Sequence, residues 1–176
     1  MKYILKSGLL MNEKEEKILA QIKPILIGWN KEIFSTDGTM LLNTTVETDV
    51  SLARINGDVR SRKYIMYDNA GKELAFAHPY YDDRNNPDIK GWPACYIPKV
   101  NLAKIQYMDM EYILTRHDNT YYTFITKENK IAITIKHRGI NGGWTIEAND
   151  KLTPQIICGF FIFCKYLERE NEFILI

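Results

Sequence analysis

Apolar and polar residues alternate along much of this chain, and that alternation predicts β-strands. Isoleucines occupy every second position from Ile131 to Ile135, and Trp144, Ile146 and Ala148 resume the same period after a glycine-containing turn. A period of two places successive side chains on opposite faces, which is typical of a sheet with one buried face. The pattern therefore favours a fold built mainly from strands.

Turn sequences between the apolar runs indicate which strands are neighbours. Thr36-Asp37-Gly38 and Asp68-Asn69-Ala70-Gly71 supply residues that tolerate the backbone of a tight hairpin. His117-Asp118-Asn119 and Lys127-Glu128-Asn129 have the same character further along. We expect one hairpin that pairs 32–35 with 40–46, another that pairs 63–67 with 73–77, and then an antiparallel meander over 112–116, 121–126 and 130–137.

A different pattern occurs near the C-terminus, where residues 156–164 include no charged side chain and no side-chain amide. A helix of this composition is apolar on every side, so other elements must enclose it. Thr153 and Pro154 suit its start, and Lys165 and Arg169 place positive charge near its end. The stretch is too short for a membrane span, which needs about 20 apolar residues. We predict an internal helix, and no transmembrane segment.

A second helix is predicted near the N-terminus. Asn12 followed by Glu15 resembles a capping box, and the apolar spacing from Ile18 to Ile22 gives a narrow helical stripe. Pro24 would stop a helix at this point. We therefore expect a short amphipathic helix over residues 12–23.

These elements together predict a mainly β fold. An apolar helix about 10 Å across fits inside a closed barrel, and closure also removes exposed strand edges. We predict a closed or nearly closed antiparallel barrel of about 12 strands around the hydrophobic C-terminal helix, plus the short N-terminal helix. Since no change of composition marks a boundary, residues 1–176 are expected to form one domain, with 80–93 as its longest loop.

Composition and charge narrow the classes of function. The chain is 45% apolar and 26% charged, and 23 basic against 22 acidic residues leave a formal charge of +1. Without a global positive field we expect no nucleic-acid binding, and any recognition of anions must be local. An odd number of cysteines, with Cys158 and Cys164 in the apolar helix, argues against a disulfide framework. Lys6 interrupts the apolar N-terminal run, so we expect no secretory signal and a cytoplasmic or peripheral membrane location.

The order of these elements resembles the tubby C-terminal-like superfamily, which includes the LURP-one-related and phospholipid scramblase families. The resemblance rests on the turns Asp37-Gly38 and Asp68-Asn69-Ala70-Gly71, the strand Trp144–Ala148 and the helix Ile156–Cys164, and it covers most of the chain from Ile25 onward. The helix at 12–23 and the tail at 172–176, which would add a strand after the C-terminal helix, depart from the pattern. The resemblance implies a barrel around a central helix and a phosphoinositide or membrane surface as partner. It transfers no binding residue, because no family motif matches this sequence residue by residue.

Two basic clusters are the candidate anion-binding or lipid-binding residues. Arg60, Arg62 and Lys63 lie at the entrance to a predicted strand, and Lys136 and Arg138 precede a glycine-containing turn. Guanidinium and ammonium groups bind phosphate through charge-assisted hydrogen bonds. The clusters form one site only if the fold brings them together, and the alternative for each is a solvated strand end.

Neither a cofactor nor a metal is expected, and we assign no catalytic residue. His78 with Asp82, Asp83 and Asp88 is the best place to look for a metal, but their spacing does not match a calcium loop. Cys95 has no neighbouring histidine or helix N-terminus that would activate its thiol. A structural role for this cysteine is the safer interpretation.

The expected function is therefore a non-catalytic intracellular binding domain of tubby-like type that recognises a phospholipid headgroup or another anion, with no protein partner specified. One alternative is a small-molecule carrier, which needs an empty barrel interior, and another is an enzyme with its site in the 78–93 loop. The positions of Phe160, Phe161 and Phe163 separate a carrier from a plugged barrel. If the helix is enclosed, Phe161→Asp should prevent soluble folding by burying an unpaired charge.

Overall fold

Twelve β-strands and one long α-helix make up the part of the chain that this computed structural model describes, which is residues 1–24, 29–49, 61–81, 100–149 and 151–171. The elements are β1 (Lys2–Lys6), β2 (Leu9–Asn12), β3 (Ile18–Pro24), β4 (Lys31–Phe34), β5 (Met40–Thr48), β6 (Arg62–Asp68), β7 (Glu73–Tyr80), β8 (Leu102–Tyr107), β9 (Met110–Asp118), β10 (Tyr121–Thr126), β11 (Ile131–His137), the 3-10 helix η2 (Gly139–Asn141), β12 (Trp144–Ala148) and α2 (Pro154–Arg169).

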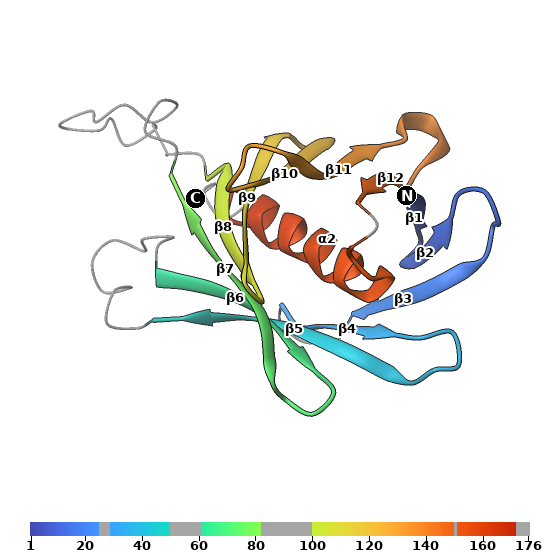
Figure 1. Ribbon diagram of the computed structural model, residues 1–176, viewed down its shortest axis with the longest axis horizontal. Helices are drawn as coiled ribbons and strands as arrows, with labels where there is room; N and C mark the ends of the chain where they lie inside the picture. The colour runs from blue at the N-terminus through green and yellow to red at the C-terminus, as the bar shows by residue number, and fades with distance from the viewer. Residues whose placement is uncertain (25–28, 50–60, 82–99, 150, 172–176) are drawn as a thin grey trace.

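The strands form one closed antiparallel barrel in which each strand pairs with its neighbours in sequence (Figure 1). β1 pairs with β2 on one side and with β12 on the other, so the first and last strands close the ring. In this closing ladder Tyr3 lies opposite Ile146, and both side chains are buried. Closure pairs both edges of every strand, so none of the described strands has a free edge.

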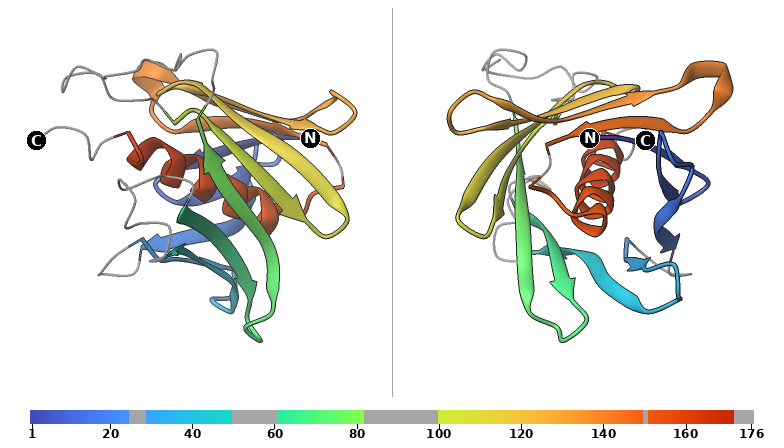
Figure 2. Two further views of the ribbon diagram at one scale, coloured as in Figure 1. Left: turned by 90° about the vertical axis from the view of Figure 1, so that its left-hand side faces the viewer. Right: turned by 45° about the vertical axis from the view of Figure 1, so that its right-hand side comes forward.

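The helix α2 lies inside this ring of strands, as Figures 1 and 2 show. Every residue from Ile156 to Cys164 is buried. The ring of Phe160 packs against three aromatic side chains, one each from β8, β9 and β10, and Phe163 packs against Tyr64 of β6. The predicted barrel around a hydrophobic C-terminal helix is therefore confirmed, and the helix provides the core against which the strands pack.

Turn chemistry explains why the predicted hairpins form. In the β4–β5 turn the Asp37 carboxylate accepts a hydrogen bond of 2.9 Å from the backbone amide of Thr39. In the β6–β7 turn the Asp68 carboxylate accepts hydrogen bonds of 2.9 and 2.8 Å from the amides of Ala70 and Lys72. Each aspartate accepts hydrogen bonds from turn amides that have no partner in the strand ladder. These bonds fix the turn, and the turn fixes the register of the flanking strands.

The prediction of a helix over residues 12–23 is wrong. This segment forms the turn and most of the second strand of the β2–β3 hairpin. β2 and β3 pair antiparallel through Leu9–Gln21 and Leu10–Ala20. The Asn12 side chain does accept hydrogen bonds from the amides of Lys14 and Glu15, at 2.9 and 3.4 Å, but these close a turn rather than start a helix. Asparagine side chains stabilise both structures, and here pairing with a neighbouring strand decides between them.

The β1–β2 turn depends on a glycine that a strand of the barrel approaches closely. Gly8 has a φ of 79°, and a Cβ built there would lie 2.7 Å from the carbonyl oxygen of Ile22 on β3. The Gly8 carbonyl also accepts a hydrogen bond of 2.7 Å from the Ile22 amide. Replacement of Gly8 therefore forces the β1–β2 turn and β3 apart.

We expect Gly8→Ala to lower the free energy of unfolding by more than about 2 kcal/mol, because backbone strain at positive φ adds to the clash with Ile22. Gly38→Ala is the matched control, since Gly38 has a φ of 86° but no described atom lies within 4 Å of its Cβ position. That variant should lose only the conformational strain, about 1–2 kcal/mol. Chemical denaturation of both variants measures the difference, and equal losses would contradict the close-approach argument.

Candidate functional site

The structure gives the first predicted basic cluster internal partners. Arg60 lies outside the described residues. The Arg62 guanidinium lies 3.1 Å from the carboxylate of Glu170, whose side chain is only 4% exposed. Lys63 lies 2.7 Å from a carboxylate oxygen of Glu73 and above the ring of Phe76. Both described members of this cluster are therefore already neutralised by carboxylates.

The second cluster lies on a distant part of the barrel wall. Lys136 is an exposed residue of β11 whose ammonium group is 5.0 Å from the ring centre of Tyr121. Arg138 directly precedes the 3-10 helix η2. Four strands, β7 to β10, separate β11 from β6 by the shorter way around the barrel. The fold does not bring the two clusters together into one site.

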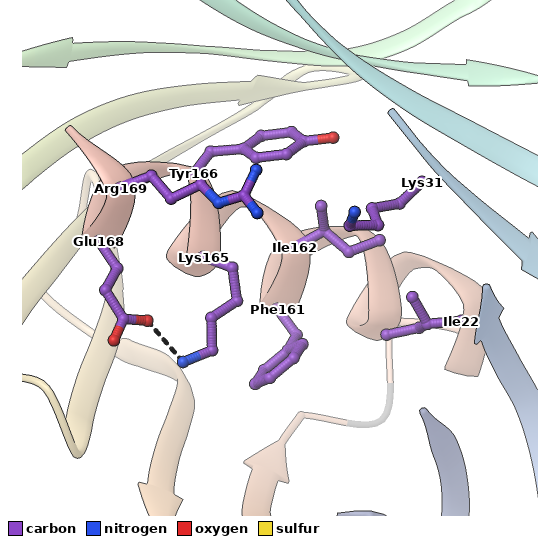
Figure 3. Close-up of a pocket in the computed structure, with 8 residues that line it drawn as sticks. All are labelled: Ile22, Lys31, Phe161, Ile162, Lys165, Tyr166, Glu168 and Arg169. Atoms are coloured by element: carbon purple, nitrogen blue, oxygen red, sulfur yellow. Dashed lines mark hydrogen bonds and ion pairs between the residues drawn. The ribbon is translucent and has the colours of Figure 1, made fainter. Parts of the chain in front are cut away.

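A cavity of about 290 Å³ lies between the C-terminal half of α2 and the wall formed by β3 and β4 (Figure 3). It is the candidate functional site. The helix contributes both apolar and charged side chains to its lining, while β3 and β4 contribute one residue each. The lining residues are Ile22, Lys31, Phe161, Ile162, Lys165, Tyr166, Glu168 and Arg169.

Helical spacing explains why the helix presents charged groups here. Side chains three and four residues apart lie on the same face, so Ile162, Lys165 and Arg169 follow one another along one side of α2. The apolar stretch that packs against the strands ends at Cys164. Basic residues follow at once, Lys165 next to Cys164 and Arg169 one turn further along, and both border the cavity.

The basic residues of the cavity differ in how they are paired. Lys165 lies 2.6 Å from a carboxylate oxygen of Glu168, one turn along the helix. Among the described residues, by contrast, no acidic partner lies within ion-pair distance of Lys31 or Arg169. Figure 3 shows the ends of these two side chains directed toward one another across Ile162, and that of Lys165 directed away toward Glu168.

The charge on Lys31 is disfavoured by this environment. Burial is the larger cause that lowers the pKa of the Lys31 amine, and the nearby positive charge of Arg169 is the second. A bound anion between the two groups would reverse the second effect, because an opposite charge stabilises the ammonium form. The cavity therefore holds two like charges in a position that a ligand of opposite charge would stabilise.

Aromatic side chains hold the cavity lining in place. The Arg169 guanidinium lies 5.2 Å from the ring centre of Trp29, and the Lys165 ammonium lies 4.2 Å from that of Trp144. The Tyr166 hydroxyl donates a hydrogen bond of 2.6 Å to the Trp29 carbonyl. Each described tryptophan thus contacts a basic group of the cavity, so intrinsic fluorescence can report on a bound ligand.

Other candidate chemistry has less support. Among the described residues, no group of three or more His, Cys, Asp or Glu side chains is placed to hold a metal ion. Burial raises the pKa of the Cys158 thiol to about 12 and that of Cys164 well above its usual range, so both are unreactive at neutral pH. His78 is an exposed residue of β7. Cys95 and Asp82, Asp83 and Asp88 of the 78–93 loop lie outside the described residues.

A second depression, of about 890 Å³, lies on the outer surface near the β8–β9 and β10–β11 turns. It is larger than the cavity, but acidic and basic residues line it in equal number. One of these pairs, Lys130 and Glu128, is already joined at 2.8 Å. Its charges compensate one another, so it offers no preference for a charged ligand.

The cavity residues were missed by sequence reasoning for different reasons. In the sequence, Lys165 and Arg169 have the ordinary position of positive charges at the end of a helix, although their spacing of four also places them on one face. Lys31 stands in an ordinary strand sequence, and no local pattern predicts that it faces the helix. Only closure of the barrel brings β4 beside the last turns of α2.

The chain matches no protein-family model, no curated protein and no solved structure. The tubby-like resemblance therefore stays a prediction. Within the described part of the chain, no helix combines the length and the hydropathy needed to cross a bilayer.

Proposed function

We propose that this protein is a non-catalytic binding module that recognises an anionic group, a carboxylate or a phosphate, in the cavity between α2 and the β3–β4 wall. The observation that carries the proposal is the pair of convergent cations, Lys31 and Arg169, neither of which has a carboxylate within ion-pair distance among the described residues. Partly buried cations form stronger hydrogen bonds with anions than solvated ones do.

The ligand is still an anion, as the sequence predicts, but Lys31 and Arg169 bind it in place of the two predicted basic clusters. A barrel closed around a C-terminal helix is the arrangement that the tubby-like resemblance implies, and this supports a phospholipid headgroup as one source of the anion. Lys136 and Arg138 remain available for contact with a membrane surface. Arg62 and Lys63 have carboxylate partners of their own and drop out of the proposed site.

The two alternative functions, a small-molecule carrier and an enzyme, have less support than anion binding. A carrier with an empty interior conflicts with the position of α2, although the cavity leaves room for a small ligand beside it. An enzyme with its site in the 78–93 loop would draw mainly on residues outside the described part of the chain. No observation favours it over anion binding.

The test compares a cavity variant, Lys31→Gln with Arg169→Gln, and a surface variant, Lys136→Gln with Arg138→Gln. Calorimetric titration with hexanoate, inorganic phosphate and a soluble inositol phosphate measures binding of free anions. Sedimentation with phosphatidylcholine vesicles, with and without phosphoinositide, tests the lipid source. We expect the cavity variant to lose at least tenfold in affinity and the surface variant to lose little, since a hydrogen bond to a charged group contributes about 1.5–3 kcal/mol. No binding by wild type, or equal binding by both variants, would overturn the proposal.

A further inference from the structure

Part of the cavity wall is apolar. Ile22 of β3 and Phe161 and Ile162 of α2 line it together with the charged groups. Phe161 is 8% exposed, whereas its neighbour Phe160 is fully buried. A purely polar ligand such as an inositol phosphate would leave these apolar walls without a complementary partner. An apolar body attached to the anion would cover them.

The size of the cavity limits that body. At about 290 Å³ the cavity lies at the lower end of the range for small-molecule sites. If each non-hydrogen atom takes about the share of one liquid water, close to 30 Å³, the cavity accepts on the order of ten such atoms. The paired acyl chains of a phospholipid do not fit this space, but a medium-length organic acid does.

The charges also orient the ligand. Lys31 and Arg169 form the end of the cavity that attracts an anion, while Lys165 is neutralised by Glu168 at 2.6 Å. Beside Lys165, the Glu168 carboxylate would repel a second negative charge of the ligand. A ligand with one anionic group would therefore place that group between Lys31 and Arg169 and the rest of its atoms along Ile162 toward Ile22 and Phe161.

We propose that the cavity is a site for small organic monocarboxylates, with the carboxylate held by Lys31 and Arg169 and an apolar body of up to roughly seven carbons against Ile22, Phe161 and Ile162. This inference rests on the proposed anion-binding function and specifies its ligand. It assigns different parts of the ligand to different residues, so the two parts can be tested separately.

The experiment titrates acetate, butyrate, hexanoate, octanoate and dodecanoate, below their micellar concentrations, into the wild-type protein and two variants. Burial of one methylene strengthens binding about fourfold, so affinity should rise by that factor per methylene up to octanoate and then level off. Lys31→Gln with Arg169→Gln should lower every affinity by a similar factor and leave the dependence on chain length. Ile22→Ser should weaken that dependence, so that it lowers the affinity for octanoate by a larger factor than the affinity for acetate.

The outcomes separate this inference from the function on which it rests. Three results would overturn the monocarboxylate assignment. Affinity could be independent of chain length, or inorganic phosphate or a soluble inositol phosphate could bind more tightly than octanoate. Affinity could also rise with chain length without levelling off and without responding to Ile22→Ser. The anion-binding function would survive each of these results if affinity still depended on Lys31 and Arg169. Absence of binding for every anion would overturn both.

Discussion

A Phe160→Asp variant is expected to yield no soluble protein that unfolds cooperatively. Phe160 is fully buried, and its ring stacks on Phe124 at 5.4 Å and meets the edges of Tyr107 and Tyr112. Truncation of such a side chain alone costs about 3–5 kcal/mol. The unpaired carboxylate adds a desolvation penalty, so the total approaches the whole stability of a typical domain, about 5–15 kcal/mol. Expression with size-exclusion chromatography and thermal denaturation measures the outcome.

The matched control is the same substitution one residue later. Phe161 belongs to the buried core but also borders the cavity, and its ring centre lies 5.7 Å from the Lys165 ammonium. A carboxylate at this position would face a solvent-connected space near a cation. We therefore expect Phe161→Asp to fold with reduced stability and to lose anion binding. This revises the sequence-based expectation that Phe161→Asp prevents folding, because only the structure distinguishes the two neighbouring phenylalanines.

A folded Phe160→Asp variant with wild-type cooperativity would show that the barrel does not pack tightly around α2. Loss of folding in both variants would instead show that the cavity side of the helix is as tightly enclosed as the other side. Either result would change the description of the cavity. The comparison therefore tests the fold and the candidate site with one pair of proteins.

The β4–β5 and β6–β7 hairpins and the helix were predictable because each has a local cause. The Asp37 and Asp68 carboxylates bond to amides within their own turns, so the turn sequence is sufficient to place both hairpins. The helix is an unbroken apolar stretch, and its need for enclosure follows from that composition. Local interactions of this kind are present in the sequence itself.

The first three strands were not predictable in the same way. The amides of Lys14 and Glu15 bond to Asn12 as they would at the start of a helix, so the local pattern is ambiguous. What decides is pairing of the segment with neighbouring strands, β3 with β2 and β4, and closure of the ring by β1 and β12, whose residues are more than a hundred positions apart in the sequence. The cavity has the same origin, because Lys31 and Arg169 meet only after the barrel closes.

The candidate residue Arg62 has its largest effect on stability rather than on binding. Its guanidinium is paired with Glu170, which also accepts a hydrogen bond of 3.0 Å from the Tyr64 hydroxyl. This contact joins the end of α2 to β6. We expect Arg62→Met to lower the free energy of unfolding at pH 7 by about 3 kcal/mol, the low end for loss of one partner of a buried ion pair, because the Arg62 side chain is 28% exposed.

The stability lost in Arg62→Met should depend on pH, because the protonation of Glu170 changes with pH. Burial is the main cause that raises the pKa of Glu170 above its usual 4.5, while Arg62 and Tyr64 oppose the rise. A carboxyl group with a raised pKa binds more protons in the folded state, so its contribution to stability is complete below pH 4.5 and is lost as the pH rises through the raised value. Without Arg62 the pKa rises further. The difference between wild type and Arg62→Met should therefore be small near pH 4.5 and grow toward pH 7.

The double variant Arg62→Met with Glu170→Gln isolates the cause. It removes the carboxylate that Arg62→Met leaves unpaired, while the new amide oxygen can still accept the hydrogen bond from Tyr64. We expect it to recover most of the lost stability at pH 7 and to lose the pH dependence of the single variant. Urea denaturation of all three proteins between pH 4.5 and 7.5 provides the measurement. A pH-independent loss, with no recovery in the double variant, would mean that Arg62 stabilises the barrel through its packing on Trp29, 5.5 Å from the ring centre, and not through Glu170.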